Sequence, residues 1–170
     1  GVQRIHQVVQ QENMEEVLLE KPPTIAVYSP PNMQPWDDAV TLALTYADIP
    51  FDKVFDAEVL AGALTEYDWL HLHHEDFTGQ YGKFYGSYHA HQWYRENKRR
   101  MEELASDLGY SKVSRLKLDV VLKIKEYCGA GGFMFAMCSA TDTYDIALAA
   151  EGLDICESMF DGDGMDPDAQ

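Results

Sequence analysis

The sequence GGFMFAMCSATD occupies residues 131–142 and carries no charge before its last residue. Consecutive apolar residues bounded by glycines are typical of a parallel strand that is covered on both faces. We therefore expect a central strand over residues 131–137 and, after a short junction, a helix over residues 143–150. Cys138 falls at that junction, and two small residues, Ser139 and Ala140, follow it.

The rest of the chain alternates short β-branched or aromatic runs with segments of helical spacing. This alternation predicts parallel βαβ units and an α/β fold. A helix over residues 3–20 leads into the pattern, and residues 75–92, rich in aromatics and glycine, read as a long loop. The predicted strands cover residues 24–28, 51–55, 67–74 and 153–156, and the predicted helices cover residues 35–47, 59–64, 93–108 and 114–128.

The chain has 170 residues, with 13 basic and 29 acidic side chains and a net charge of −16. This length suits one domain. The acidity argues against nucleic acid and against an anionic membrane surface as partners, because both need a basic face. No apolar run reaches the length of a spanning helix, so membrane insertion is not expected. The chain starts at Gly1 rather than Met, so an upstream targeting segment, and with it the compartment, stays open.

Composition divides the chain into three parts. Residues 1–22 form the leading helix, or the end of an upstream segment, residues 23–160 form the α/β domain, and residues 161–170 form an acidic tail. The tail resembles a calcium loop, but Met165 replaces an acidic ligand and no glutamate closes the loop. A solvated tail is the preferred interpretation.

Cys138 is the first candidate for chemistry. A nucleophile on a sharp strand-to-helix turn projects from the carboxyl edge of the sheet, and the following helix N-terminus favours a thiolate. Backbone N–H groups of such a turn can also hold an oxyanion. The alternative is a small buried hydrophobic residue. The three cysteines show no CxxC spacing, so neither a disulfide framework nor a zinc site is expected.

A second candidate is the polar group at the end of the strand over residues 67–74. It contains His71, His73, His74, Glu75 and Asp76. The carboxyl ends of parallel strands share one edge, so this group should lie near Cys138. It would supply a general base for the thiol. The alternatives are histidines satisfied beneath a helix and acids that cap the loop, or a His/carboxylate metal site, for which the spacing matches no specific motif.

Two segments together, residues 131–142 and the run DWLHLHHEDFTGQ over residues 68–80, resemble the class I glutamine amidotransferase-like superfamily. The closer resemblance is to a bacterial group often labelled asparagine synthetase B, and it extends over residues 25–170. It implies a flavodoxin-like, three-layer α/β sandwich with helices on both faces of a mostly parallel sheet, and Cys138 at the nucleophile elbow. The chain has neither the N-terminal cysteine nor the Ser-Gly-Gly loop of an asparagine synthetase.

Two functional hypotheses follow. In the first, the chain is a thiol-dependent amidohydrolase or amidotransferase acting on a small polar amide, without cofactor or metal. Cys138 attacks, His74 or His73 accepts the proton, and Glu75 orients the base. The oxyanion and the substrate are held by Ser139, Asp76 and Gln80. In the second hypothesis, the chain is a binding or assembly module, which the absence of any histidine after Cys138 favours. Self-association and contact with flanking segments both stay open.

Overall fold

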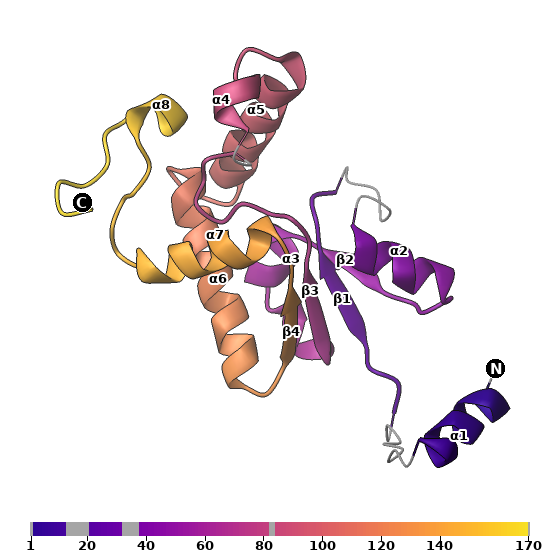
Figure 1. The fold of residues 1–170 in the computed structure, drawn as a ribbon. Helices are drawn as coiled ribbons and strands as arrows, with labels where there is room; N and C mark the ends of the chain where they lie inside the picture. The colour runs from indigo at the N-terminus through magenta and orange to yellow at the C-terminus, as the bar shows by residue number, and fades with distance from the viewer. Residues whose placement is uncertain (1, 13–20, 32–37, 82–83, 170) are drawn as a thin grey trace.

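A computed structural model describes residues 2–12, 21–31, 38–81 and 84–169. Its centre is a four-stranded sheet in which all neighbouring strands are parallel, in the order β2-β1-β3-β4 (Figure 1). The strands are β1 (Ile25–Tyr28), β2 (Asp52–Val54), β3 (Trp69–Leu72) and β4 (Phe133–Ala136). The expected α/β class with a parallel sheet is confirmed.

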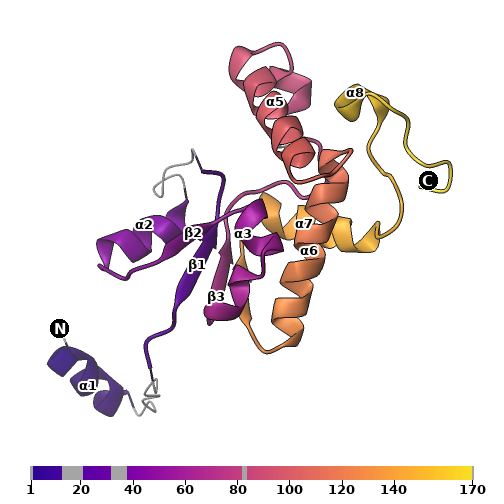
Figure 2. The same cartoon turned by 180° about the vertical axis from the view of Figure 1, so that it is seen from behind.

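Helices connect the strands of this sheet. Their bounds are α1 (Val2–Gln11), α2 (Ala39–Tyr46), α3 (Asp56–Leu60), the 3₁₀ helix η2 (Ala63–Glu66), α4 (Tyr85–Tyr88), α5 (Gln92–Asp107), α6 (Val113–Gly129), α7 (Ser139–Ala149) and α8 (Ser158–Asp161). Figures 1 and 2 place α2 apart from α3 and α6, which lie together on the other side of the sheet. The arrangement is that of a flavodoxin-like, three-layer sandwich.

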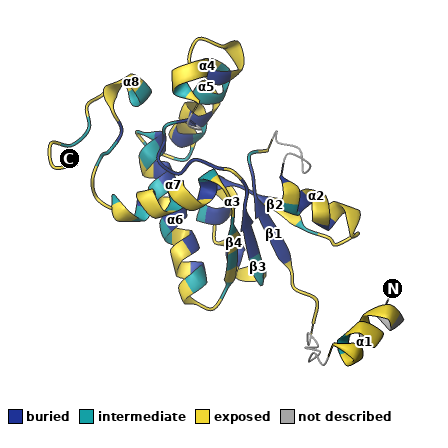
Figure 3. Ribbon diagram, viewed as in Figure 1, coloured by how far each residue is buried: buried dark blue, intermediate teal, exposed yellow. Residues whose placement is uncertain are grey.

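Side chains alternate between the two faces of each strand, so the register separates the two layers. Ala26 and Tyr28 of β1 and Leu70 and Leu72 of β3 share one face and belong to the main hydrophobic core. That core includes the apolar side of α6, with Leu116, Val120, Val121 and Ile124 all fully buried (Figure 3). The opposite face carries Val27 and His71 of the same strands and meets the N-terminal end of α2.

The apolar run over residues 131–137 is not the central strand that its composition predicts. β4 pairs with β3 alone and forms one edge of the sheet as described. Phe133 is 60% exposed and Phe135 is 38% exposed, whereas central strand β1 is fully buried. An apolar run indicates that a strand is buried in part, but it does not determine which strands it pairs with.

Other expected boundaries shift. The last long helix begins at Ser139, directly after Cys138, and residues 153–156 form no strand. The third strand ends at Leu72, and the aromatic loop contains the short α4. The leading helix ends at Gln11, and residues 13–20, like residues 35–37 of the second predicted helix, lie outside the described part.

Within the part of the chain that the structure describes, no helix combines the length and the apolar character that a span requires.

Candidate functional site

Cys138 lies at a sharp strand-to-helix turn. It follows β4 after Met137 alone, caps the N-terminus of α7, and has φ 54° and ψ −132°. A positive φ is unfavourable for any residue with a Cβ, so neighbouring structure holds Cys138 in this conformation. Its thiol is free and the residue is exposed. The sharp junction expected of an elbow is thus present, and an exposed Cys138 excludes the buried-hydrophobe interpretation.

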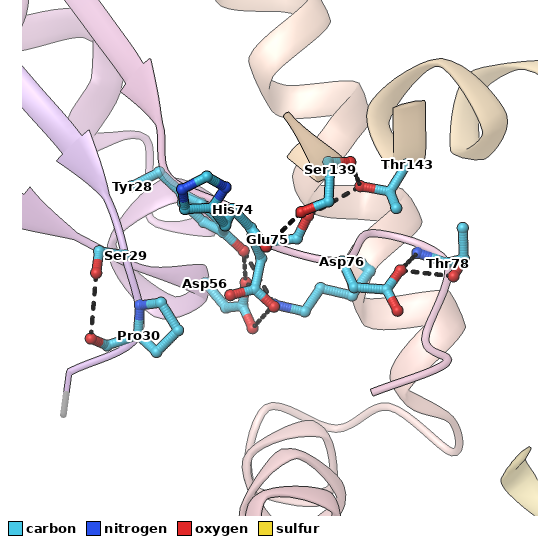
Figure 4. Close-up of polar contacts among 11 residues, drawn as sticks. Tyr28, Ser29, Pro30, Asp56, His74, Glu75, Asp76, Thr78, Ser139 and Thr143 are labelled. Carbon is cyan, nitrogen blue, oxygen red and sulfur yellow. Dashed lines mark hydrogen bonds and ion pairs between the residues drawn. The ribbon is translucent and has the colours of Figure 1, made fainter. Parts of the chain in front are cut away.

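Two hydroxyl groups join the start of α7 to the segment after β3. Ser139 Oγ donates to the carbonyl oxygen of His74 at 3.0 Å, and Thr143 Oγ1 donates to that of Glu75 at 2.9 Å (Figure 4). These bonds bring the polar group after β3 next to the residue that follows Cys138. The expected meeting of the two segments at the carboxyl edge of the sheet is therefore observed.

The three histidines have different environments. His71 is completely buried, with Nε2 3.0 Å from Asp38 Oδ2 and Nδ1 3.1 Å from the carbonyl oxygen of Phe135. His73 is 2% exposed. The side chain of His74 is 40% exposed, and its Nε2 lies 3.9 Å from Asp38 Oδ2. Of these three rings, that of His74 is therefore the accessible one.

Figure 4 also shows how His74 is oriented. Its ring projects on the side away from Ser139, toward the strand that ends at Tyr28. A half-exposed side chain can exchange rotamers rapidly. In this orientation the ring of His74 points away from Ser139, the first residue of α7.

Asp38 connects α2 to the histidines. Its Oδ1 accepts hydrogen bonds from the backbone N–H groups of Val40 and Thr41, as an N-cap residue does, while its Oδ2 faces His71. Burial opposes ionisation of this carboxyl. The bonds from His71 and the two backbone groups outweigh burial, so the pKa of Asp38 lies below its ordinary value.

We expect Asp38 to contribute to acid unfolding. A carboxyl whose pKa is lowered by folding stabilises the native state above its unfolded pKa, about 3.9, and loses that contribution as pH falls through its folded pKa. Asp38→Asn keeps a capping oxygen but removes the charge. Urea unfolding at about pH 6 and about pH 3 should show a smaller loss of stability on acidification in this variant than in the parent chain. Equal losses would refute this role for Asp38.

Glu75 points into the protein rather than toward Cys138. Its Oε1 lies 3.5 Å from Lys117 Nζ, and Asp56 Oδ2 lies 3.0 Å from the same nitrogen. Tyr28 donates its hydroxyl hydrogen to Asp56 and accepts a hydrogen bond of 3.0 Å from Lys117 (Figure 4). All four side chains are buried. We call Tyr28, Asp56, Glu75 and Lys117 the buried charge cluster.

Burial raises the pKa of Glu75, against the opposing effect of Lys117. Burial also disfavours the charge on Lys117, but Glu75 and Asp56 outweigh it and raise the pKa of this lysine. The cluster therefore keeps Lys117 protonated inside the core. The carboxylate that lies beside the half-exposed His74 is that of Asp38, and not that of Glu75.

The remaining predicted residues lie along the segment after β3. Asp76 is buried and accepts hydrogen bonds from the backbone N–H and the hydroxyl of Thr78, which closes a local turn. Gln80 is half-buried, and its carbonyl oxygen accepts a bond of 3.5 Å from the Tyr94 hydroxyl. Both residues thus shape the loop in this structure. A role for either in holding substrate stays a prediction.

The aromatic side chains of this loop divide into two groups. Phe77 and Tyr81 are buried in the core, whereas Phe84 and Tyr88 are exposed. Phe77 and Tyr81 therefore pack this loop against the core.

The surroundings of the other two thiols, Cys128 and Cys156, raise their pKa values. Burial raises the pKa of Cys128. Burial, with the nearby carboxylates of Asp161 and Asp154, raises the pKa of Cys156 to about 12. Cys156 is fully buried and directs its sulfur at the carbonyl oxygen of Thr78. Of the three free thiols, that of Cys138 is the exposed one.

The acidic end of the chain is more ordered than a solvated tail. Asp154, Asp161 and Asp163 converge, and Lys112 pairs with all three, at 3.6 Å from Asp161 and 2.6 Å from Asp163. Three converging carboxylates could hold a metal ion, but here the lysine ammonium occupies the centre of the group. We therefore treat the cluster as an ion-pair network that attaches this segment to the start of α6.

One cavity of about 110 Å³ lies between α6, α7 and residues 152–155, and it is lined by Phe77, Thr78, Leu118 and Ala147 among others. Cys138 and His74 are not among its lining residues. The cavity therefore gives no support to a substrate pocket at the elbow.

Sequence reasoning missed Asp38, Asp56 and Lys117 as members of this region. Asp38 carries a visible signal, since an acid before an apolar helix is a usual N-cap. Lys117 stands among the apolar positions of its helix, between Leu116 and Val120, which signals a buried charge with a partner. The identity of that partner depends on contacts distant in sequence.

The chain was compared with protein families, curated proteins and solved structures. No family model, curated protein or solved structure matches it. The functional assignment therefore rests on the geometry of the chain itself.

Proposed function

We propose that this chain is a glutamine amidotransferase-like domain in which Cys138 acts as the nucleophile of a thiol-dependent amidohydrolase or amidotransferase. The observation that carries the proposal is the backbone of Cys138. An exposed cysteine held at φ 54° between a parallel strand and a helix has the placement that nucleophiles use on α/β sheets. Backbone strain of this kind is concentrated at functional sites.

The proposed reaction uses the groups around the elbow. The Cys138 thiolate adds to the carbonyl carbon of a small polar amide, and the N-terminus of α7 stabilises the oxyanion. His74, turned toward α7, carries the thiol proton to the leaving nitrogen, so the C–N bond breaks and ammonia departs. Water then hydrolyses the thioester and releases the acid. Asp38, 3.9 Å from His74, is better placed than Glu75 to orient the base.

Alkylation tests the proposal. Iodoacetamide at neutral pH should modify Cys138 at least about tenfold faster than Cys128 and Cys156, because only the thiolate reacts and burial suppresses ionisation of the other two. Peptide mass spectrometry measures the three rates. Denatured protein, in which the three thiols should react alike, is the control for intrinsic reactivity.

Exposure alone would produce part of this selectivity, so the pH profile and turnover decide the assignment. A Cys138 whose reaction rate rises below about pH 8 shows an activated thiol. Ammonia release from glutamine or asparagine should require Cys138 and disappear in Cys138→Ser. A rate profile of an ordinary thiol, with no amide turned over, would instead favour the second hypothesis, a binding or assembly module that retains the fold.

A further inference from the structure

Three carboxylates near the end of the chain converge on one point. Asp154, Asp161 and Asp163 offer one oxygen each, and these oxygens lie within 4.8 Å of one another. We call these three residues the acidic triad. Lys112 pairs with all three, so that three acids and one base leave a formal charge of −2. Residues 151–170 contain seven acids and no base, so this segment supplies no cation that offsets the charge.

One oxygen of the acidic triad is buried without a hydrogen bond. The side chain of Asp161 is 8% exposed, and no donor among the described residues forms a hydrogen bond with its Oδ2. The Lys112 ammonium lies 3.6 Å from this atom, which allows charge attraction but exceeds the length of a hydrogen bond. A buried carboxylate oxygen costs free energy unless a donor or a metal ion satisfies it. Asp161 Oδ2 therefore indicates a ligand that lies closer than the ammonium.

Backbone groups orient two carboxylates of the triad. The backbone N–H of Cys156 donates to Asp154 Oδ1 at 3.0 Å, and that of Asp163 donates to Asp161 Oδ1 at 3.3 Å. The second oxygen of each carboxylate, Oδ2, is the one that faces Lys112. Outer contacts of this kind orient the ligands of metal ions in proteins. The two carboxylates are thus turned toward a common centre.

A polar cavity of about 250 Å³ borders the acidic triad. Lys112 and Asp161 line it together with Glu102, Tyr81 and Tyr110, among others. The side chain of Glu102 is 48% exposed, so the cavity reaches the surface. A space of this size holds several water molecules. It therefore offers an ion a path to the triad, water to complete its coordination, and room for the ammonium of Lys112 to withdraw.

From these observations we propose that the acidic triad binds a calcium ion, which displaces the ammonium of Lys112. Ca²⁺ accepts about six to eight oxygen ligands in irregular geometry, whereas Mg²⁺ demands a near-ideal octahedron. Carboxylates from residues 154 and 161–163, completed by water, suit the first ion. A divalent ion also lowers the residual charge of the group from −2 to −1. The site is not an EF-hand loop, and it is independent of the proposed chemistry of Cys138.

Calcium titration of the full chain tests the proposal. After treatment with a chelator, calorimetry at physiological ionic strength should show one site with a Kd of about 0.1–1 mM. Asp161→Asn should weaken binding at least about tenfold, because an amide replaces a charged ligand. Asp163→Asn should do the same at a side chain that is 58% exposed, where the change leaves the packing intact. Asp168→Asn is the matched control, since Asp168 is exposed in the same segment and lies outside the triad.

Lys112→Gln tests the displacement of the ammonium. Without this competing cation, calcium should bind at least about tenfold more tightly and should raise the melting temperature more than in the parent chain. Lys123→Gln is the control for net charge. It removes a cation from the same helix, α6, at a side chain that pairs with Glu126 outside the triad. It should leave the affinity for calcium unchanged.

Three results would overturn the proposal. The first is no calcium uptake at about 5 mM by either the parent chain or Lys112→Gln. The second is undiminished binding in both Asp161→Asn and Asp163→Asn, which would place the ion elsewhere. The third is an equal gain in affinity from Lys112→Gln and Lys123→Gln, which would show that calcium responds to the net charge of the chain alone.

Discussion

Replacing Lys117 with methionine is expected to lower the free energy of unfolding by about 3–5 kcal/mol, the usual cost of removing one partner of a buried ion pair. Lys117 is 1% exposed and pairs with Asp56 at 3.0 Å and Glu75 at 3.5 Å. Methionine fills much of the same volume, so the loss reports the charge rather than a cavity. Urea unfolding at neutral pH measures it.

Lys123→Met on the same helix is the matched control. Lys123 is half-exposed and pairs with Glu126 three residues away, so its loss should cost less than about 1 kcal/mol. Adding Asp56→Asn and Glu75→Gln to Lys117→Met should restore part of the stability, because no buried carboxylate is then left without its cation. A loss below about 1 kcal/mol for Lys117→Met alone would mean that the cluster is not an ion pair.

The pH dependence of this variant has a definite sign. Folding raises the pKa of Glu75, so its protonated form is favoured in the native state and stability falls as pH rises from its unfolded pKa through its folded pKa. Without Lys117 that pKa rises further. Lys117→Met should therefore be less destabilising at about pH 5 than at about pH 7.

Gly79→Ala is expected to be the second most damaging change, at about 2–4 kcal/mol. Gly79 has φ +77°, and a Cβ built there would lie 2.8 Å from the backbone nitrogen of Ser114 at the start of α6. Alanine would therefore meet both left-handed strain and a collision with backbone that cannot rotate away. Thermal or urea unfolding gives the difference.

Gly62→Ala separates these two causes. Gly62 also has a positive φ, +88°, but no atom lies within 4 Å of its added Cβ. Its loss should be about 1–2 kcal/mol, from the backbone conformation alone. Equal losses at both positions would show that the segment after β3 does not press on α6 at Gly79.

The fold class follows from local patterns. Short apolar runs separated by helical spacing identified the four strands and the long α5 and α6, because periodicity and burial are linked within each element. The position of β4 could not be predicted, since strand order depends on which edges meet. The composition of residues 131–137 is compatible both with a central strand and with an edge strand.

The candidate site likewise has one part that the sequence predicts and one part that it does not. Cys138 and the polar group after β3 were predicted to share an edge because parallel strands end together, and hydroxyl bonds from Ser139 and Thr143 join them. The buried charge cluster draws its members from β1, α3, α6 and the segment after β3, so no local pattern relates them. Glu75 could therefore be expected near the site, but not its pairing with Lys117.

The backbone of Cys138 has a consequence for the tolerance of this position to change. Glycine would adopt the same torsion angles without a steric penalty, so the chain retains a cysteine there at the expense of stability. The side chain of Cys138 contributes little packing energy to offset this loss of stability, because the residue is exposed. At position 138, keeping an outward-facing thiol therefore lowers the stability of the fold. Selection for heat resistance alone would be expected to replace Cys138 with glycine.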